Sequence, residues 1–257
     1  KTCSYNCVFC QLGPTPQSTL ERREYVPTDA VLDELRRWLD TGEQANYITL
    51  AGNGEPTLHS RFGEVLREIR RFSSIPAVLL TNGSLFGSRR VRYAAGEADV
   101  VKISLSAWDE ESFGHINRPA PGLDLDVVVE GCRLLQQSCS AAIWLEVMLI
   151  DGMNSEPADV AKIARLAERI QPERIQLNTV VRPPAEAGIQ PVAAEKLIPQ
   201  VHGKIDNLRY ASCGDHRVVE SYETRYAALP PVDRHLENKT LACVYLSVPV
   251  LEKGVLP

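Results

Sequence analysis

The stretch VVKISLS, residues 100–106, carries the pattern that decides the fold of this chain. Successive side chains of a β-strand point to opposite faces of the sheet. Three apolar side chains share one face: Val101, Ile103 and Leu105. Three polar side chains share the other: Lys102, Ser104 and Ser106. Because burying polar groups without partners costs a few kcal/mol each, this second face has to meet a polar environment.

Two later stretches repeat the alternation. In AIWLEVMLI (142–150), Glu146 lies on the face opposite to the aliphatic residues, and in RIQLNT (174–179) Gln176 and Asn178 do the same. Parallel strands covered by helices on both faces normally read as continuous apolar runs, which these stretches do not. We therefore predict a sheet that curves around a polar lumen, with helices outside and a ligand inside, as in a barrel or partial barrel.

Strands alternate with amphipathic helical patterns along most of the chain. Two further strands are predicted, at 47–51 and 77–83. Helices are predicted at 28–39, which Thr28 would cap, and at 62–72, 88–95, 125–137, 156–170 and 192–205. This rhythm is typical of parallel βαβ units with right-handed crossovers. A first strand is expected before the N-terminal cysteines and is missing from this chain, and no fold is assigned to 206–257.

The composition narrows the class of protein. The 257 residues carry a formal net charge of −5, which argues against a general nucleic-acid binder. No apolar run approaches the roughly 20 residues that span a bilayer, so no membrane partner is expected. Seven cysteines are an odd number at irregular spacing, which excludes a secreted disulfide framework and favours the cytoplasm.

Three of the seven cysteines, Cys3, Cys7 and Cys10, lie in CSYNCVFCQLG (3–13). Three thiolates are one short of a closed structural zinc site, so a zinc site would need a distant ligand such as His59. A redox pair of Cys7 and Cys10 would leave Cys3 unexplained. An iron–sulfur cluster held at three corners uses all three and leaves one iron open. The spacing alone leaves these alternatives open and favours the cluster.

Two motifs resemble the signature of the radical S-adenosylmethionine (SAM) superfamily. C-x3-C-x-Φ-C is formed by the three cysteines with Phe9, and strand 47–51 leads into AGNGEPTLH (51–59), which is similar to the glycine–glutamate–proline motif of the superfamily. The resemblance covers roughly residues 1–185. It implies an α/β fold, a partial (β/α)6 TIM-like barrel, which agrees with the polar lumen. It also implies a [4Fe-4S] cluster whose open iron binds SAM, and reductive cleavage of SAM to a 5′-deoxyadenosyl radical that abstracts hydrogen from a substrate.

The resemblance implies that SAM lies along the strand ends. Phe9 would lie near the adenine, and the backbone of 52–56 would meet the methionine end, where glycine permits close approach. Several relatives place an aspartate where Ser106 stands here. The alternatives are an Asn-Gly turn for Asn82 and a salt bridge to Lys102 for Glu146. The predicted cofactor-binding residues are Phe9, Gly52, Asn53, Gly54, Glu55, Pro56, Asn82, Ser104, Ser106, Glu146, Asn178 and Thr179.

Substrate contacts are predicted for Asn117 and Arg118 of INRP (116–119) and for Arg182 of VVRPPAE. The combination of CSYNCVFCQLG, GNGEPTLH and RPPAE most resembles stand-alone radical enzymes related to wybutosine-type transfer-RNA synthases. The resemblance implies a small-molecule or modified-nucleoside substrate and a reductant such as flavodoxin or ferredoxin. The acidic charge argues against a transfer-RNA cradle.

Two alternative functions stay open. One is an activating enzyme that generates a glycyl radical on a partner protein, and the other is a non-enzymatic module in which the three cysteines bind zinc. The predicted domains are a radical SAM core at 1–185 and a C-terminal extension at 186–257, which begins with a helix and continues as a poorly defined segment.

Overall fold

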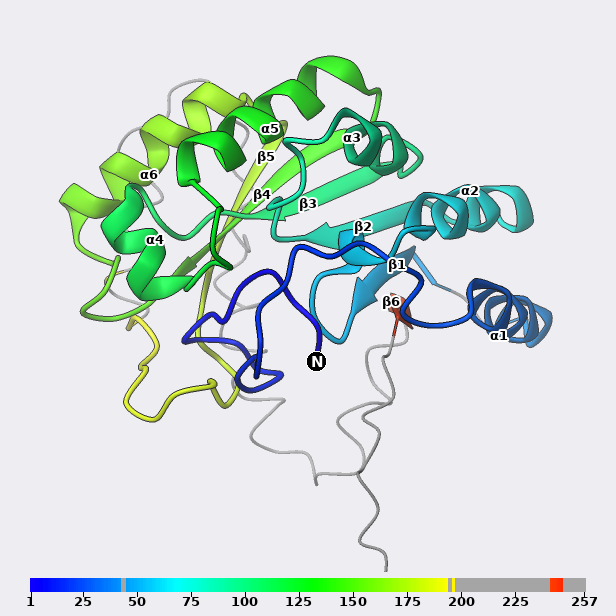
Figure 1. Ribbon diagram of the computed structural model, residues 1–257, viewed down its shortest axis with the longest axis horizontal. Coiled ribbons are helices and arrows are strands. Elements are labelled where there is room, and N and C mark those ends of the chain that lie inside the picture. Colours follow the sequence, from blue (N-terminus) through cyan, green and yellow to red (C-terminus); the bar gives the residue numbers. More distant parts are fainter. Residues whose placement is uncertain (43–44, 194–195, 197–240, 247–257) are drawn as a thin grey trace, which may run out of the picture.

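The protein is built on a six-stranded parallel sheet in the order β5-β4-β3-β2-β1-β6 (Figure 1). It is seen in a computed structural model that describes residues 1–42, 45–193, 196 and 241–246. The strands are β1 (Tyr47–Gly52), β2 (Ala77–Thr81), β3 (Val100–Ser104), β4 (Ala142–Leu149), β5 (Arg174–Thr179) and β6 (Leu241–Leu246). The first five confirm the predicted strands, although β2 and β3 end two residues earlier than predicted.

The predicted alternation of faces is confirmed in β3 and β4. Val101 and Ile103 are 0% and 1% exposed, and they belong to the main hydrophobic core. Lys102 and Ser104, on the other face, are half-buried. The aliphatic residues of β4 are buried in the same core, whereas Glu146 is half-buried. The apolar face therefore packs under helices and the polar face lines the concave side of the sheet.

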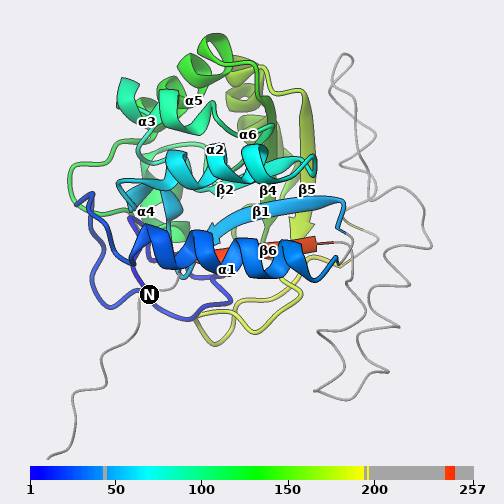
Figure 2. The same ribbon diagram turned by 90° about the vertical axis from the view of Figure 1, so that its right-hand side faces the viewer.

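Helices cover the convex face of the sheet, as Figures 1 and 2 show. The helices of this layer are α1 (Thr28–Asp40), α2 (Phe62–Phe72), α3 (Arg89–Ala95), α5 (Leu125–Ser138) and α6 (Pro157–Ile170). Each packs against the next along the chain, in the same direction in which β1 to β5 follow one another across the sheet. The five predicted helices between 28 and 170 are thereby confirmed, and the α/β fold is that of a partial barrel. The helix predicted at 192–205 lies almost wholly outside the described residues.

Two local features differ from the prediction. The seven-residue helix α4 (Glu110–Ile116) was not predicted; it begins at a capping box in which Asp109 accepts a hydrogen bond from Ser112 N at 2.8 Å. Thr28 does not cap α1, because it is itself the first helical residue. Instead, a carboxylate oxygen of Glu24 accepts from Thr28 N at 2.7 Å, which satisfies one of the free N–H groups at the helix start.

The sixth strand comes from the far end of the described chain. β6 runs parallel to β1 with Tyr47 opposite Leu241 and Gly52 opposite Leu246. It forms the edge of the sheet beside β1. None of the helices in the described residues is long and apolar enough to cross a membrane.

Helix α5 approaches the loop after β2 closely, and this approach requires glycine at position 131. A Cβ atom on Gly131 would lie 2.6 Å from the carbonyl carbon of Phe86 and 2.7 Å from the nitrogen of Gly87. Both are backbone atoms, so the contact cannot be relieved by a rotamer change. The closeness of helix and loop here depends on the absence of a side chain.

We expect Gly131→Ala to lower the free energy of unfolding by about 1–3 kcal/mol, because the added methyl overpacks the contact between α5 and the loop. The matched control is Gly114→Ala in α4, where a Cβ atom would meet nothing within 4 Å. That variant should be neutral or more stable by up to about 1 kcal/mol, since alanine is the better helix former. Urea unfolding measures both, and equal stability of the two variants would contradict the close approach.

Candidate functional site

The cysteine loop, residues 3–10, pairs along its backbone with the segment that ends α4. Val8 N–H donates to the carbonyl of Ile116 at 3.0 Å, and Asn6 N–H donates to the carbonyl of Asn117 at 3.0 Å. These bonds satisfy main-chain groups that the loop cannot pair internally. The end of α4 therefore fixes one side of the cysteine loop.

The residues just before the loop pair with the turn that follows β1. Thr2 N–H donates to the carbonyl of Asn53 at 2.9 Å, and Glu55 N–H donates to the carbonyl of Thr2 at 3.0 Å. Gly54 lies between them with φ of 132°, and a Cβ atom there would lie 1.6 Å from Thr2 O. Glycine is required at 54 because the N-terminal segment passes so close. The predicted approach of SAM to Gly54 stays a prediction.

Each of the three cysteine sulfurs has an N–H donor beside it. Nδ2 of Asn117 lies 3.4 Å from Sγ of Cys7, and Nζ of Lys1 lies 3.0 Å from Sγ of Cys10. Sγ of Cys3 accepts from two donors: the Tyr5 nitrogen at 3.4 Å and Nδ2 of Asn82 at 3.7 Å. Donors in these positions stabilise thiolates, which are the form of cysteine that binds metal.

The donor set fits an iron–sulfur cluster. Burial raises the pKa of Cys3 to about 12 and that of Cys7 to about 12, so both are protonated thiols at neutral pH until a metal displaces the protons. Within the described ranges, no three His, Cys, Asp or Glu side chains converge on one point as ligands of a single ion would. A [4Fe-4S] cluster takes one cysteine per iron, so its ligands do not need to converge in this way.

The carboxylate of Glu55 is surrounded by hydrogen-bond donors from its own protein. Oε1 accepts from Thr57 N at 3.0 Å, Thr57 Oγ1 at 2.6 Å and Thr81 Oγ1 at 2.6 Å, and Oε2 accepts from Asn82 N at 2.7 Å. Glu55 is 6% exposed, and burial raises its pKa while these donors oppose the shift. Its side chain therefore ties the turn after β1 to the end of β2.

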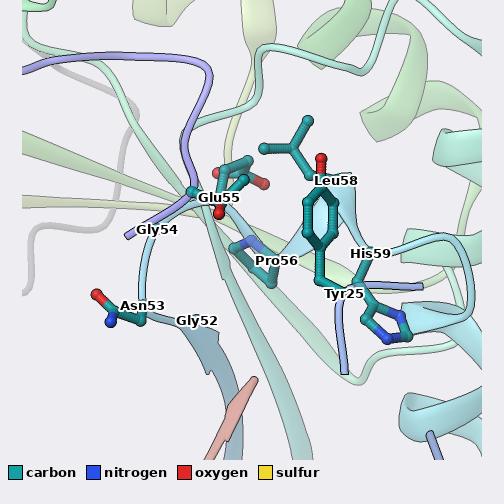
Figure 3. A pocket seen from close by; sticks show the side chains of 9 residues that line it. Tyr25, Gly52, Asn53, Gly54, Glu55, Pro56, Leu58 and His59 are labelled. Atoms are coloured by element: carbon teal, nitrogen blue, oxygen red, sulfur yellow. The ribbon is translucent and has the colours of Figure 1, made fainter. Parts of the chain in front are cut away.

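A recess of about 270 Å³, including the part open to solvent, lies beside this turn (Figure 3). Gly52, Asn53 and Pro56 line it together with Tyr25 and His59, which the sequence analysis did not place there. Pro56 is buried and begins the short 3-10 helix Pro56–Leu58.

Both ring nitrogens of His59 have protein partners. Nδ1 lies 3.2 Å from Arg61 N, which donates to it, and Nε2 lies 3.0 Å from the carbonyl of Val26, to which it donates. His59 is 2% exposed. It is therefore a structural residue and is not positioned as a fourth ligand for zinc.

Three polar side chains from neighbouring strands meet in the lumen, and we call Lys102, Glu146 and Asn178 the lumen triad. Glu146 forms an ion pair with Lys102, and Nδ2 of Asn178 lies 2.5 Å from the same carboxylate oxygen. The side chains of Lys102 and Glu146 remain 21% and 23% exposed. The salt bridge considered for Glu146 is thus present, and the triad stays accessible to a ligand.

Two predicted cofactor residues use their hydroxyl groups within the protein. Ser106 is 2% exposed and its Oγ accepts from Met148 N at 3.3 Å. Oγ1 of Thr179 donates to the carbonyl of Leu149 at 2.9 Å and accepts from Val192 N at 2.7 Å. Ser104, by contrast, stays half-buried on the lumen face.

Asn154 is a structural residue that the sequence analysis missed. Its Nδ2 donates to the carbonyls of Ser106 and Met148, both at 2.8 Å, and its Oδ1 accepts from Ile150 N at 2.6 Å. Asn154 is fully buried and holds the ends of β3 and β4 together. The sequence NSEP (154–157) at the start of α6 is typical of a turn, and it was the one feature of the sequence that could have indicated a structural role for Asn154.

Two predicted substrate residues form contacts on the open side of the cysteine loop. Arg118 forms an ion pair with Glu186, and Arg182 donates to the side-chain carbonyl of Gln11. Glu186 N–H also donates to the carbonyl of Val8 at 3.2 Å, so the segment around 182–186 lies against the loop. Residues just beyond the predicted domain boundary at 185 thus contact the core.

Two other predicted contacts are directed into the protein. Asn117 is 5% exposed and faces Cys7. Phe9 is partly buried and packs against a small apolar cluster of Val8, Ile116, Ile150 and Val180. Contacts of Phe9 with adenine and of Asn117 with substrate stay predictions.

Comparison with known proteins gives one family over most of the chain. A model described as the radical SAM superfamily matches residues 1–167. The chain is 35% identical to a protein of Brachyspira hyodysenteriae named GTPase Obg, over 71% of this chain and 27% of that protein. It is 31% identical to a UPF0026 protein of Methanocaldococcus jannaschii, over 76% of this chain and 61% of that protein. The chain thus spans less than two thirds of either relative.

Two further matches are more distant. GTP 3′,8-cyclase of Limosilactobacillus fermentum is 28% identical over 60% of this chain and 45% of that enzyme. The crystal structure of Streptococcus suis SuiB bound to S-adenosylmethionine superposes with a TM-score of 0.62 at 15% identity, over 87% of this chain and 50% of that chain. The second match shows a shared fold.

We expect Glu55→Gln to lower the free energy of unfolding by about 1–3 kcal/mol, because the amide nitrogen would face backbone N–H donors and leave one of them unpaired. The control is Glu34→Gln, which makes the same change on an exposed position of α1 and should stay within about 0.5 kcal/mol of the parent. Urea unfolding measures both. A Glu55→Gln variant as stable as the parent would show that the four hydrogen bonds do not hold the turn.

Proposed function

This chain belongs to the radical SAM superfamily, and we propose that it is an enzyme that cleaves SAM reductively and uses the radical to abstract hydrogen from a substrate. The cysteine loop carries this proposal. It presents three thiols, each beside an N–H donor, on a backbone held by the turn after β1 and by the end of α4. That arrangement supports a cluster-binding loop.

Cys3, Cys7 and Cys10 would hold a [4Fe-4S] cluster. When bound, the cluster supplies the electron that splits the sulfonium of SAM into methionine and a 5′-deoxyadenosyl radical. The chain itself keeps the ligand sulfurs in place, and Glu186 pairs with the loop through its backbone N–H, which donates to the carbonyl of Val8. The N–H donors beside the sulfurs favour the thiolate form that binding requires.

SAM would lie between the cysteine loop and the lumen, at the carboxyl ends of the strands, where parallel α/β sheets bind their ligands. The half-buried candidates to contact it are Gly52, Asn53, Ser104 and Asn178. Lys102 and Glu146 of the lumen triad offer a hydrogen-bond donor and acceptors, and they would orient a polar substrate toward the radical. Glu55 acts as a support for this site, because its oxygens are already occupied.

The proposed substrate is a small molecule or a modified nucleoside. Two observations favour this class: the motifs resemble those of enzymes related to wybutosine-type transfer-RNA synthases, and a relative is named GTP 3′,8-cyclase. The net charge of −5 argues against a long nucleic-acid cradle. We further propose a cytoplasmic location and a flavodoxin or ferredoxin as reductant.

We expect the anaerobically reconstituted chain to contain iron and sulfide and, after reduction with dithionite, to convert SAM to 5′-deoxyadenosine. Cys7→Ala should lower the rate of this conversion by about 100-fold or more, because the loss of a ligand leaves the cluster incomplete. This is the upper end of the effects seen when a group near a metal is removed. Liquid chromatography with mass spectrometry measures the product.

Cys139→Ala is the matched control, since Cys139 lies at the end of α5 and is not among the loop cysteines. It should keep the iron content and the activity of the parent. One zinc and no iron in the parent protein would instead support the zinc-binding module, and unchanged activity of Cys7→Ala would exclude the proposed role of the loop.

A further inference from the structure

The INRP stretch (116–119) holds the cysteine loop. The carbonyls of Asn117 and Arg118 both accept from Asn6 N–H, at 3.0 Å and 3.1 Å. Arg118 has φ of 47°, in the left-handed region that residues other than glycine rarely adopt. A residue keeps such a conformation only where its surroundings fix it, and here it directs the chain out of α4 along the loop.

This backbone geometry places the Asn117 side chain against one ligand sulfur. Asn117 is 5% exposed, and its Nδ2 lies 3.4 Å from Sγ of Cys7. A metal-bound thiolate carries no proton and can only accept, so the amide has to present its nitrogen, as it does here. Asn117 lies 110 positions after Cys7 in the sequence, so only the fold creates this contact.

The other sulfur contacts in the described residues come from a backbone nitrogen or from side chains that also bond elsewhere: Nζ of Lys1 lies 3.0 Å from Sγ of Cys10 and also donates to the carbonyl of Gly13. Cys3 receives its shorter contact from the Tyr5 backbone, and Nδ2 of Asn82 is 3.7 Å from Cys3 while it donates to Ser4 Oγ at 2.9 Å. Asn117 has one side-chain donor contact, and it goes to Cys7. It is therefore the donor that a substitution can remove most cleanly.

We propose that Asn117 is a positioning residue that raises the reduction potential of the cluster through its hydrogen bond to Cys7. The inference rests on the proposed function, since it requires the cluster. Reduction adds one negative charge, part of which resides on the ligand sulfurs. An N–H donor fixed beside a sulfur stabilises that charge more than it stabilises the oxidised state, and hydrogen bonds to the sulfurs are among the factors that set cluster potentials. Burial strengthens the effect because few waters compete for the sulfur.

The test is a potentiometric titration of the reconstituted protein without SAM, followed by electron paramagnetic resonance of the reduced cluster. Asn117→Leu removes the donor at similar volume, and the equilibrium constant for one-electron reduction should fall about tenfold, which corresponds to about 59 mV. Asn117→Asp is isosteric but replaces the donor with a carboxylate, so its constant should fall further.

Asn6→Asp is the matched control: its Oδ1 still accepts from Thr15 N, and no sulfur contact is lost. That constant should fall by less than the constant of Asn117→Asp, because the charge added at the half-buried Asn6 replaces no donor to a sulfur.

Each outcome decides the proposal. Iron-loaded Asn117→Leu with the parent potential would overturn it, as would a shift in Asn6→Asp as large as that in Asn117→Asp. If both Asn117 variants fold but bind no cluster, Asn117 serves ligand binding and the proposal is wrong. A parent protein that binds no iron refutes the proposed function itself, which separates that failure from a failure of this inference.

Discussion

The main-chain groups of the cysteine loop need partners from other segments, because residues 3–10 belong to none of the helices or main strands of the sheet. Those partners come from the end of α4, and Thr2, just before the loop, pairs with the turn after β1. The position of the sulfurs therefore depends on the fold of the first four strands and their connections. A substitution that shifts either segment would move the ligands without touching a cysteine.

Glu55 connects this loop to the sheet. Its N–H pairs with Thr2, and its carboxylate receives four hydrogen bonds that include Asn82 N. Asn82 in turn contacts Cys3. Burying a carboxylate without hydrogen-bond partners costs free energy. Glu55 can therefore hold the turn in place only when all of its partners are present. The glycine–glutamate–proline motif thus has a structural task as well as the cofactor contact that we propose.

The sequence was sufficient to predict the first five strands, the helices of the outer layer and the polar lumen, since these depend on local periodicity, but it gave no prediction for β6. It missed α4, whose seven residues are too few to show a helical period. It also could not assign individual side chains: Ser106 lies beyond the end of β3 and is buried against β4, and Asn117 meets Cys7 across 110 residues. Such contacts depend on where strands end and how loops return, which local patterns do not encode.

The lumen triad differs from Glu55 in one physical respect. Glu55 is buried and fully hydrogen-bonded, so its oxygens cannot turn to a ligand without leaving donors unpaired. Lys102 and Glu146 neutralise each other, and about a fifth of each side chain remains exposed. The protein therefore combines a fully hydrogen-bonded carboxylate that holds the turn after β1 with a partly exposed ion pair that faces the lumen, and it is at the second that we propose a substrate to be recognised.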